Sequence, residues 1–174
     1  MDNLVVLGLG SNRPWNSNPS IQGGLVDCYN ILKMAIAELG NVFASIQQAS
    51  IYETEPIPKS SQNNFFNTAV SGFFKGSAEE LLTRIHQIEA MFGRDRSKEI
   101  RWGERSLDID ILLFGDKVLN TQALTIPHPR LEERRFALEP LLELIPEAVS
   151  PKTGVPYREI CDTLPEQGVV KTSY

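Results

Sequence analysis

The sequence has little of what membrane-spanning, secreted or metal-cluster proteins need. Its longest apolar runs fall far short of the roughly 20 residues that cross a bilayer. Cysteine occurs only at Cys28 and Cys161 among 174 residues, too few for a disulfide framework or a metal cluster. The opening residues, MDNLVVLGLGSN, lack the basic start and long apolar core of a signal peptide. We therefore expect a cytoplasmic protein without a membrane partner.

Positive charge is also in short supply. Lys and Arg number 17 against 22 Asp and Glu, which gives a net charge of −5. Because nucleic-acid-binding proteins usually present a basic face, we expect no nucleic-acid partner, although a local basic site is still open. The length of 174 residues and the hydrophobic content of 41% are typical of one globular domain with its own core. We expect a single domain over residues 1–174.

Hydrophobic periodicity predicts an α+β protein. Alternating apolar residues indicate strands, and apolar residues at three- and four-residue spacing indicate helices. The order is β-α-β-β-α-β-β-α with hairpins outnumbering crossovers, which favours a ferredoxin-like α/β sandwich, a mainly antiparallel sheet with helices packed on it. Strands are expected at 4–9, 42–54, 65–75, 107–114 and 117–120, and helices at 25–39, 77–92 and 138–147. A further short helix is compatible with 157–163, in the mixed tail that follows this order.

The strand expected at 107–114 carries two carboxylates in an otherwise apolar stretch. Asp108 and Asp110 are two residues apart, so they share one face of the strand, with Leu112 and Phe114, and their Cα atoms are ~6.6 Å apart. Two like charges on a partly desolvated face resist ionisation, and a divalent cation removes that conflict. Carboxylate oxygens suit Mg²⁺, and one such pair can hold two ions. The alternative is an edge strand with solvated charges.

A basic segment precedes this pair. Metal-binding carboxylates beside several guanidinium groups favour a polyphosphate site, because metal and arginines both neutralise phosphate oxygens. Alone, the basic residues would indicate a solvated loop with salt bridges. They are Arg94, Arg96, Lys98, Arg101 and Arg105.

Other polar positions give weaker signals. The turn Gly8-x-Gly10-Ser11-Asn12 fits neither a dinucleotide-binding nor a P-loop motif, so as a structural turn it needs no function. Spacing alone places Glu89 on a solvated polar helix face. His128 lies between two prolines that stiffen its loop, although a lone loop histidine usually lies at the surface. Phe65, Phe66 and Asn67 fit either a core or a site for a flat heterocycle.

In these residues the sequence resembles the family of 6-hydroxymethyl-7,8-dihydropterin pyrophosphokinases, enzymes of folate biosynthesis. The stretch R-W-G-E-R-S-L-D-I-D-I-L is similar to the family signature. The resemblance implies transfer of pyrophosphate from ATP to the hydroxymethyl group of the pterin, with release of AMP. The other matching motifs occur in family order: G-x-G-S-N at 8–12, Y-x-T-x-P at 52–56, F-F-N at 65–67, I-E at 88–89, G-R-x-R at 93–96, L-T-I-P-H at 124–128 and R-x-F at 134–136.

The resemblance also implies roles for individual residues. Asp108 and Asp110 would bind two Mg²⁺ ions that bridge the phosphates of ATP, the co-substrate, and Arg94 and Arg105 would join them as catalytic residues. The residues implied in ATP binding are Glu89, Arg96, Arg101, Trp102, Thr125, His128 and Arg134. Those implied in pterin binding are Thr54, Pro56, Phe65, Asn67 and Phe136.

Several positions depart from the family pattern. Phe65 stands where tyrosine is frequent, and His86 and Ala123 replace a common glutamine and a common arginine. Pro129 stands where a tyrosine is often found. The segment between Arg96 and Arg101 is one residue longer than the usual form, and residues 15–24 form an extended stretch.

Two other functions are compatible with the residues alone. A paired-Asp nucleotidyl transferase would use the same metal site, although an acidic protein without a broad basic face argues against it. A non-catalytic ferredoxin-like binding module would use the carboxylates and arginines as a surface ion-pair network. For the pyrophosphokinase we expect a monomer acting on two small molecules.

Overall fold

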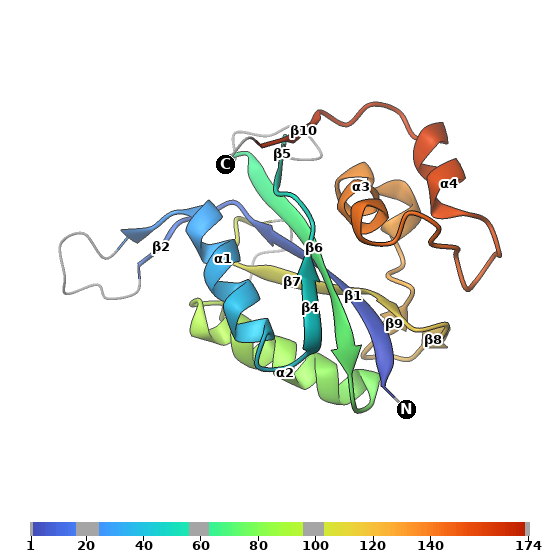
Figure 1. The fold of residues 1–174 in the computed structure, drawn as a ribbon. Helices are drawn as coiled ribbons and strands as arrows, with labels where there is room; N and C mark the ends of the chain where they lie inside the picture. Colours follow the sequence, from blue (N-terminus) through green and yellow to red (C-terminus); the bar gives the residue numbers. More distant parts are fainter. Residues whose placement is uncertain (1, 17–24, 56–62, 96–102, 173–174) are drawn as a thin grey trace.

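The computed structural model describes residues 2–16, 25–55, 63–95 and 103–172 (Figure 1). Within these residues a six-stranded sheet has the order β10-β5-β6-β1-β7, with β4 also pairing with β6, and every pairing is antiparallel. None of the helices in these ranges is long and apolar enough to cross a membrane. The strands are β1 (Asn3–Ser11), β4 (Ala44–Gln48), β5 (Tyr52–Thr54), β6 (Phe65–Phe74), β7 (Asp108–Phe114) and β10 (Val169–Lys171).

Helices cover both faces of this sheet (Figure 1). Helices α1 (Cys28–Leu39) and α2 (Ala78–Met91) pack on one face, and α3 (Arg135–Leu144) and α4 (Tyr157–Thr163) lie on the other. Alternation along β1 supplies both cores, since Val5 and Leu7 face α1 and α2 while Val6 faces α3. The predicted antiparallel α+β sandwich, with the strand order of a ferredoxin-like fold, is confirmed.

Helix ends follow the capping chemistry of the sequence. Ser77 Oγ accepts a hydrogen bond from the Glu80 N–H at 3.2 Å, and Glu80 Oε2 accepts one from the Ser77 N–H at 2.6 Å. This reciprocal capping box starts α2 where it was predicted. Helix α1 begins later than predicted, because Asp27 Oδ1 accepts from the Asn30 N–H at 2.8 Å and so fixes the first turn at Cys28.

Other boundaries also differ from prediction. Residues 25–26 form β3 (Leu25–Val26), which pairs with β2 (Trp15–Asn16), and the strand expected at 42–54 is split into β4 and β5. The expected hairpin after β7 is wrong, because β8 (Leu119–Asn120) pairs with β9 (Thr125–Ile126). Helix α3 begins at Arg135, after the 3-10 turn η1 (Leu131–Glu133), so Pro140 lies inside it instead of in its first turn.

A bulge in β7 breaks its predicted alternation. Val6 pairs with Leu113 and Leu7 pairs with Ile111, so Leu112 is an extra residue. Asp108, Asp110 and Leu112 therefore share the α3 face of the sheet as predicted, but Phe114 turns to the α1–α2 core with Ile111. The bulge lies after the two carboxylates, which keep a regular register with Gly8 and Gly10.

Candidate active site

Gly10 of β1 gives the candidate site a flat floor, while the Leu112 side chain covers Gly8. Gly10 pairs with Asp108 of β7 on one side and with Asn67 of β6 on the other, and Gly8 pairs with Asp110. Directly opposed residues share a face of a sheet, so Asp108 and Asn67 face the same side across Gly10. A Cβ atom at Gly10 would lie 3.0 Å from Asn67 Oδ1. The missing side chain leaves bare backbone between the carboxylates and this amide.

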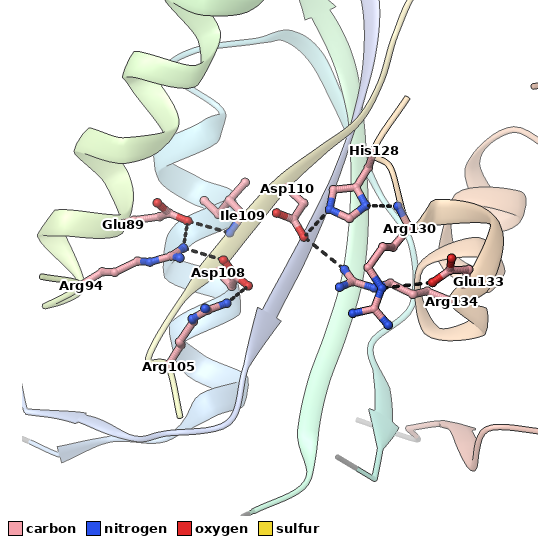
Figure 2. A network of polar contacts seen from close by, with 10 residues as sticks. All are labelled: Glu89, Arg94, Arg105, Asp108, Ile109, Asp110, His128, Arg130, Glu133 and Arg134. Carbon is pink, nitrogen blue, oxygen red and sulfur yellow. Dashed lines mark hydrogen bonds and ion pairs between the residues drawn. The ribbon is translucent and has the colours of Figure 1, made fainter. Parts of the chain in front are cut away.

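Asp108 is held by two arginines (Figure 2). Arg105 donates to Asp108 Oδ2 at 2.8 Å, and Arg94 donates to its Oδ1. Burial raises the pKa of the Asp108 carboxyl, but the charges of the two arginines and their hydrogen bonds outweigh it, so the pKa lies below its ordinary value. The two guanidinium groups differ in access, since the Arg94 side chain is 7% exposed and that of Arg105 is 29% exposed.

Glu89 is a buried carboxylate that links α2 to β7. Its side chain is 1% exposed and accepts from the Ile109 N–H at 2.9 Å and from the Arg94 guanidinium. In the described sheet β7 is an edge strand with β1 on one side. The N–H of Ile109 is therefore bound by a side chain of α2 instead of by another strand of this sheet. The solvated helix face that spacing indicated for Glu89 is wrong. The carboxylate instead fixes the strand between Asp108 and Asp110.

Asp110 faces a different pair of side chains. His128 Nε2 and an Arg134 guanidinium nitrogen each lie 3.6 Å from Asp110 Oδ2 (Figure 2). Burial and the neighbouring Asp108 charge raise the pKa of Asp110 to about 6. Burial and the Arg134 charge lower the pKa of His128 to about 4, so the imidazole is neutral at pH 7. Its Nδ1 accepts from the Arg130 N–H at 3.2 Å, which leaves Nε2 as the protonated nitrogen facing Asp110.

Because the pKa of Asp110 is raised, Asp110→Asn should increase the free energy of unfolding of the metal-free protein, by an amount that depends on pH. A carboxyl whose folded pKa is raised stabilises the fold fully below its ordinary value of 3.8 and loses that contribution as pH rises through about 6. Asp110→Asn stays neutral, so its stability relative to the native protein should rise between pH 4 and 7. Because the side chain is 38% exposed, we expect a gain of only about 1 kcal/mol. Urea unfolding with a chelator at several pH values measures it, and a pH-independent difference would contradict it.

Three of the residues predicted for the pterin, Thr54, Phe65 and Asn67, share one face of the sheet beyond Gly10. Asn67 Nδ2 donates to Thr54 Oγ1 at 2.8 Å, and both side chains are buried. Phe65 pairs with Thr54 across β5 and β6 and so shares their face. Phe136 lies in the first turn of α3, half-buried, with the Arg134 guanidinium 5.6 Å from its ring centre. Pro56 lies outside the described residues.

Of the other residues predicted to bind ATP, three lie in the described part of the chain and three lie outside it. His128 and Arg134 flank Asp110, and Thr125 lies in β9, where its Oγ1 donates to Asn120 Oδ1 at 3.3 Å. Arg96, Arg101 and Trp102 lie outside the described residues. The structure thus brings together Glu89, Arg94, Arg105, Asp108, Asp110, His128 and Arg134.

Asn12 is a site residue that the sequence did not reveal. Its side chain is fully buried, and Oδ1 accepts from the Arg105 N–H at 2.8 Å while the Asn12 N–H donates to the Arg105 carbonyl at 3.1 Å. As a structural turn, residues 8–12 need no function, and the family resemblance matches the motif at 8–12 without giving Asn12 a role. Neither observation identifies Arg105 as the partner of Asn12.

The carboxylate pair fits Mg²⁺ by its chemistry. Among the described residues no cluster of three or more His, Cys, Asp or Glu could enclose a metal, but Mg²⁺ usually takes one or two carboxylates and fills its shell with phosphate oxygens and water. Both carboxylates are partly accessible, at 28% and 38% exposure. The arginines lower the pKa of Asp108, yet the pKa of Asp110 stays raised, so the pair retains a charge conflict that a cation would relieve.

Comparison with known proteins identifies one family. The model of the 7,8-dihydro-6-hydroxymethylpterin-pyrophosphokinase family matches residues 6–146. A 2-amino-4-hydroxy-6-hydroxymethyldihydropteridine pyrophosphokinase of Bacillus subtilis is 38% identical over 146 residues, which cover 83% of this chain and 79% of the relative. A protein of the same name from Aquifex aeolicus is 34% identical over 155 residues, covering 89% and 88%.

A solved structure supports the fold. The wild-type HPPK-DHPS of Plasmodium falciparum, crystallised with SDX-DHP, superposes with a TM-score of 0.65 at 18% sequence identity. The match covers 92% of this chain and 43% of that longer chain. At this identity the likeness concerns the fold alone.

Proposed function

The chain belongs to the 7,8-dihydro-6-hydroxymethylpterin-pyrophosphokinase family, and from this premise we propose which residues carry out its reaction. The enzyme transfers pyrophosphate from ATP to the hydroxymethyl group of the pterin, a step of folate biosynthesis. The observation that best supports this proposal is the pair Asp108 and Asp110 on one face of the sheet. Guanidinium groups flank the two carboxylates, and the bare backbone of Gly10 separates Asp108 from Asn67.

Asp108 and Asp110 would hold the two Mg²⁺ ions against the phosphates of ATP. When bound, Mg²⁺ neutralises the phosphate oxygens and polarises the phosphorus under attack. The Arg105 side chain is 29% exposed, and its guanidinium would exchange Asp108 for a phosphate oxygen, because the metal would then neutralise the charge of Asp108. Arg94 is deeper and keeps its buried partner Glu89, so it would act from a fixed position.

The pterin would lie on the floor made by Gly10. Asn67 and Thr54 supply a hydrogen-bonded amide and hydroxyl at one end, and the rings of Phe65 and Phe136, together with Pro56, would form the sides. Two strand spacings separate Asn67 from Asp108, about 10 Å in all. That length lets a flat bicyclic ring bind at Asn67 while its hydroxymethyl group points toward the phosphates.

The reaction is an in-line displacement at the β-phosphorus. The pterin hydroxyl oxygen forms the new bond to the β-phosphorus and gives up its proton to the carboxylate of Asp108 or Asp110. The bond between the β-phosphorus and the bridging oxygen of AMP breaks, and AMP leaves. Positioning and charge stabilisation supply most of the catalysis. ATP would be held by Thr125, the Nε2–H of His128 and Arg134 on the Asp110 side, with Glu89, Arg96, Arg101 and Trp102 as further candidates.

Product analysis tests this reaction. Incubation with 6-hydroxymethyl-7,8-dihydropterin, ATP and Mg²⁺ should give AMP and pterin diphosphate in equal amounts, and a chelator should abolish both. Accumulation of ADP would contradict pyrophosphoryl transfer. Release of pyrophosphate with a nucleotide left on the acceptor would indicate the nucleotidyl transferase, which the names of the relatives do not favour. Absence of Mg²⁺-dependent ATP binding would indicate a non-catalytic module.

The proposed activity on two small molecules also suggests where and in what form the protein works. We expect the chain to work as a monomer in the cytoplasm, as one domain over residues 1–174, without nucleic-acid or membrane partners. The six-stranded sheet supports one domain, because β10 (Val169–Lys171) joins it by pairing with β5. Light scattering of the purified protein measures the oligomeric state.

A further inference from the structure

The segment from Asn12 to Trp15 touches both ends of the arginine-rich stretch 94–105. At the far end, Asn12 holds the Arg105 backbone by two hydrogen bonds, one to its N–H and one to its carbonyl. The Arg13 N–H adds a third, to the same Arg105 carbonyl at 3.1 Å. These bonds fix the backbone from which the Arg105 side chain reaches Asp108.

At the near end, Trp15 packs on the last turn of α2. Its ring lies 5.3 Å from that of Phe92, at an interplanar angle of 60°. Gly93 follows with φ +79°, and a Cβ atom there would lie 2.7 Å from Trp15 Nε1. The indole therefore covers the glycine so closely that no other residue fits.

Gly93 also sets the direction in which Arg94 leaves the helix. The Gly93 N–H donates to the Ala90 carbonyl at 3.0 Å, and the Arg94 N–H donates to the Glu89 carbonyl at 3.1 Å. This is the bond pattern of a Schellman motif, which needs the left-handed glycine. Glu89 thus binds the Arg94 backbone through its carbonyl and the Arg94 guanidinium through its carboxylate.

We propose that Asn12 and Trp15 are positioning residues for the reaction, each through one arginine. Asn12 fixes Arg105, and Trp15 fixes the Gly93 turn that aims Arg94. Both guanidinium groups meet on Asp108, so one short segment after β1 sets the geometry of two catalytic side chains from opposite sides. The inference rests on the proposed roles of Arg94 and Arg105.

Double-mutant cycles test the two links. Asn12→Ala and Trp15→Ala should each lower kcat/KM by about 10- to 100-fold, because small misplacements of catalytic groups cost that much. In an Arg105→Ala background, Asn12→Ala should change kcat/KM by no more than about twofold, since residues that act through one another are not additive. Trp15→Ala should likewise have little effect in an Arg94→Lys background, where lysine keeps a charge beside Glu89.

The results distinguish a failure of the proposed arginine roles from a failure of the positioning by Asn12 and Trp15. If Arg105→Ala and Arg94→Lys leave kcat/KM unchanged, the proposed arginine roles fail. If both lower it but Asn12→Ala and Trp15→Ala keep their full effects in those backgrounds, the positioning inference is overturned. Should Trp15→Ala not fold, Trp15→Phe enters the same cycle, because it keeps a ring near Phe92 while removing the indole from Gly93. Should Asn12→Ala not fold, Asn12→Ser replaces it, because the shorter side chain stays polar while it loses the reach to the Arg105 N–H.

A matched control and a second readout exclude a general loss of packing. The ring centres of Phe43 and Phe74 are 5.9 Å apart, and Phe43 packs against Gly72. Gly72 pairs with Val5 of β1, five residues before Gly10, so this contact lies away from the site. Phe43→Leu should leave kcat/KM within about twofold and combine additively with Arg105→Ala. Calorimetric titration with α,β-methylene ATP and Mg²⁺ should show the same non-additivity for Asn12 and Arg105 as the kinetics. Additive binding would overturn the link.

Discussion

Replacing Asp108 or Asp110 by asparagine should lower turnover by about 1,000-fold or more while the fold is retained. Asparagine keeps the shape of the side chain and removes the charge that would hold a divalent cation. Loss of a single group that stabilises transition-state charge commonly costs about 100- to 1,000-fold, and here metal and phosphate positions are lost together. Steady-state kinetics with saturating Mg²⁺ and ATP measures the change, and circular dichroism verifies the fold.

A matched variant sharpens this result. Asp116 lies in the exposed turn after β7, so Asp116→Asn makes the same chemical change outside the site and should leave turnover near normal. Without metal, Asp110→Asn should be somewhat more stable than the native protein at pH 7, yet nearly inactive. An Asp108→Asn or Asp110→Asn enzyme with near-normal turnover would remove the basis for the metal role.

Arg94→Ala should destabilise the protein by about 3–5 kcal/mol, the cost of leaving a buried charge without its partner. The Glu89 carboxylate is 1% exposed and the Arg94 side chain 7% exposed, so water cannot take the place of the guanidinium. Adding Glu89→Gln should recover much of the loss, because the neutral amide oxygen can still accept from the Ile109 N–H. Equilibrium urea unfolding gives these free energies.

An exposed pair supplies the comparison. Arg130 and Glu133 form an ion pair at 3.1 Å with exposures of 41% and 64%, and Arg130→Ala should cost less than about 1 kcal/mol. A loss for Arg94→Ala no larger than that for Arg130→Ala would show that the Glu89–Arg94 contact is not a buried charge pair in solution. It would also weaken the assignment of Glu89 as the residue that holds β7.

Sequence alone predicted the part of this site that depends on local periodicity. The two-residue spacing of Asp108 and Asp110 was sufficient to place both carboxylates on one face, and the edge position that we considered for their strand is also correct, since β7 ends the strand order of the described sheet. Their charges are not simply solvated, however. Asp108 is paired with two arginines and partly buried.

Features that depend on contacts distant in sequence were not predictable. The extra residue Leu112 is apolar like its neighbours, so the bulge leaves no trace in the hydrophobic pattern. Glu89 lies on a helix whose apolar stripe is clear, but its partner Ile109 is 20 residues away. Asn12 meets Arg105 across 93 residues, and β10 completes the sheet by pairing with β5. For Glu89 and Asn12 the polar side chain was visible in the sequence, while its partner was set by the fold.

Calorimetric titration with α,β-methylene ATP, with and without Mg²⁺, tests the central claim most directly. The native protein and Asp116→Asn should bind this non-transferable analogue much more tightly with Mg²⁺ than without it. Asp108→Asn and Asp110→Asn should lose most of that Mg²⁺-dependent gain while keeping any metal-independent binding. The same Mg²⁺-dependent gain in all four proteins would show that the two carboxylates of β7 do not hold the metal.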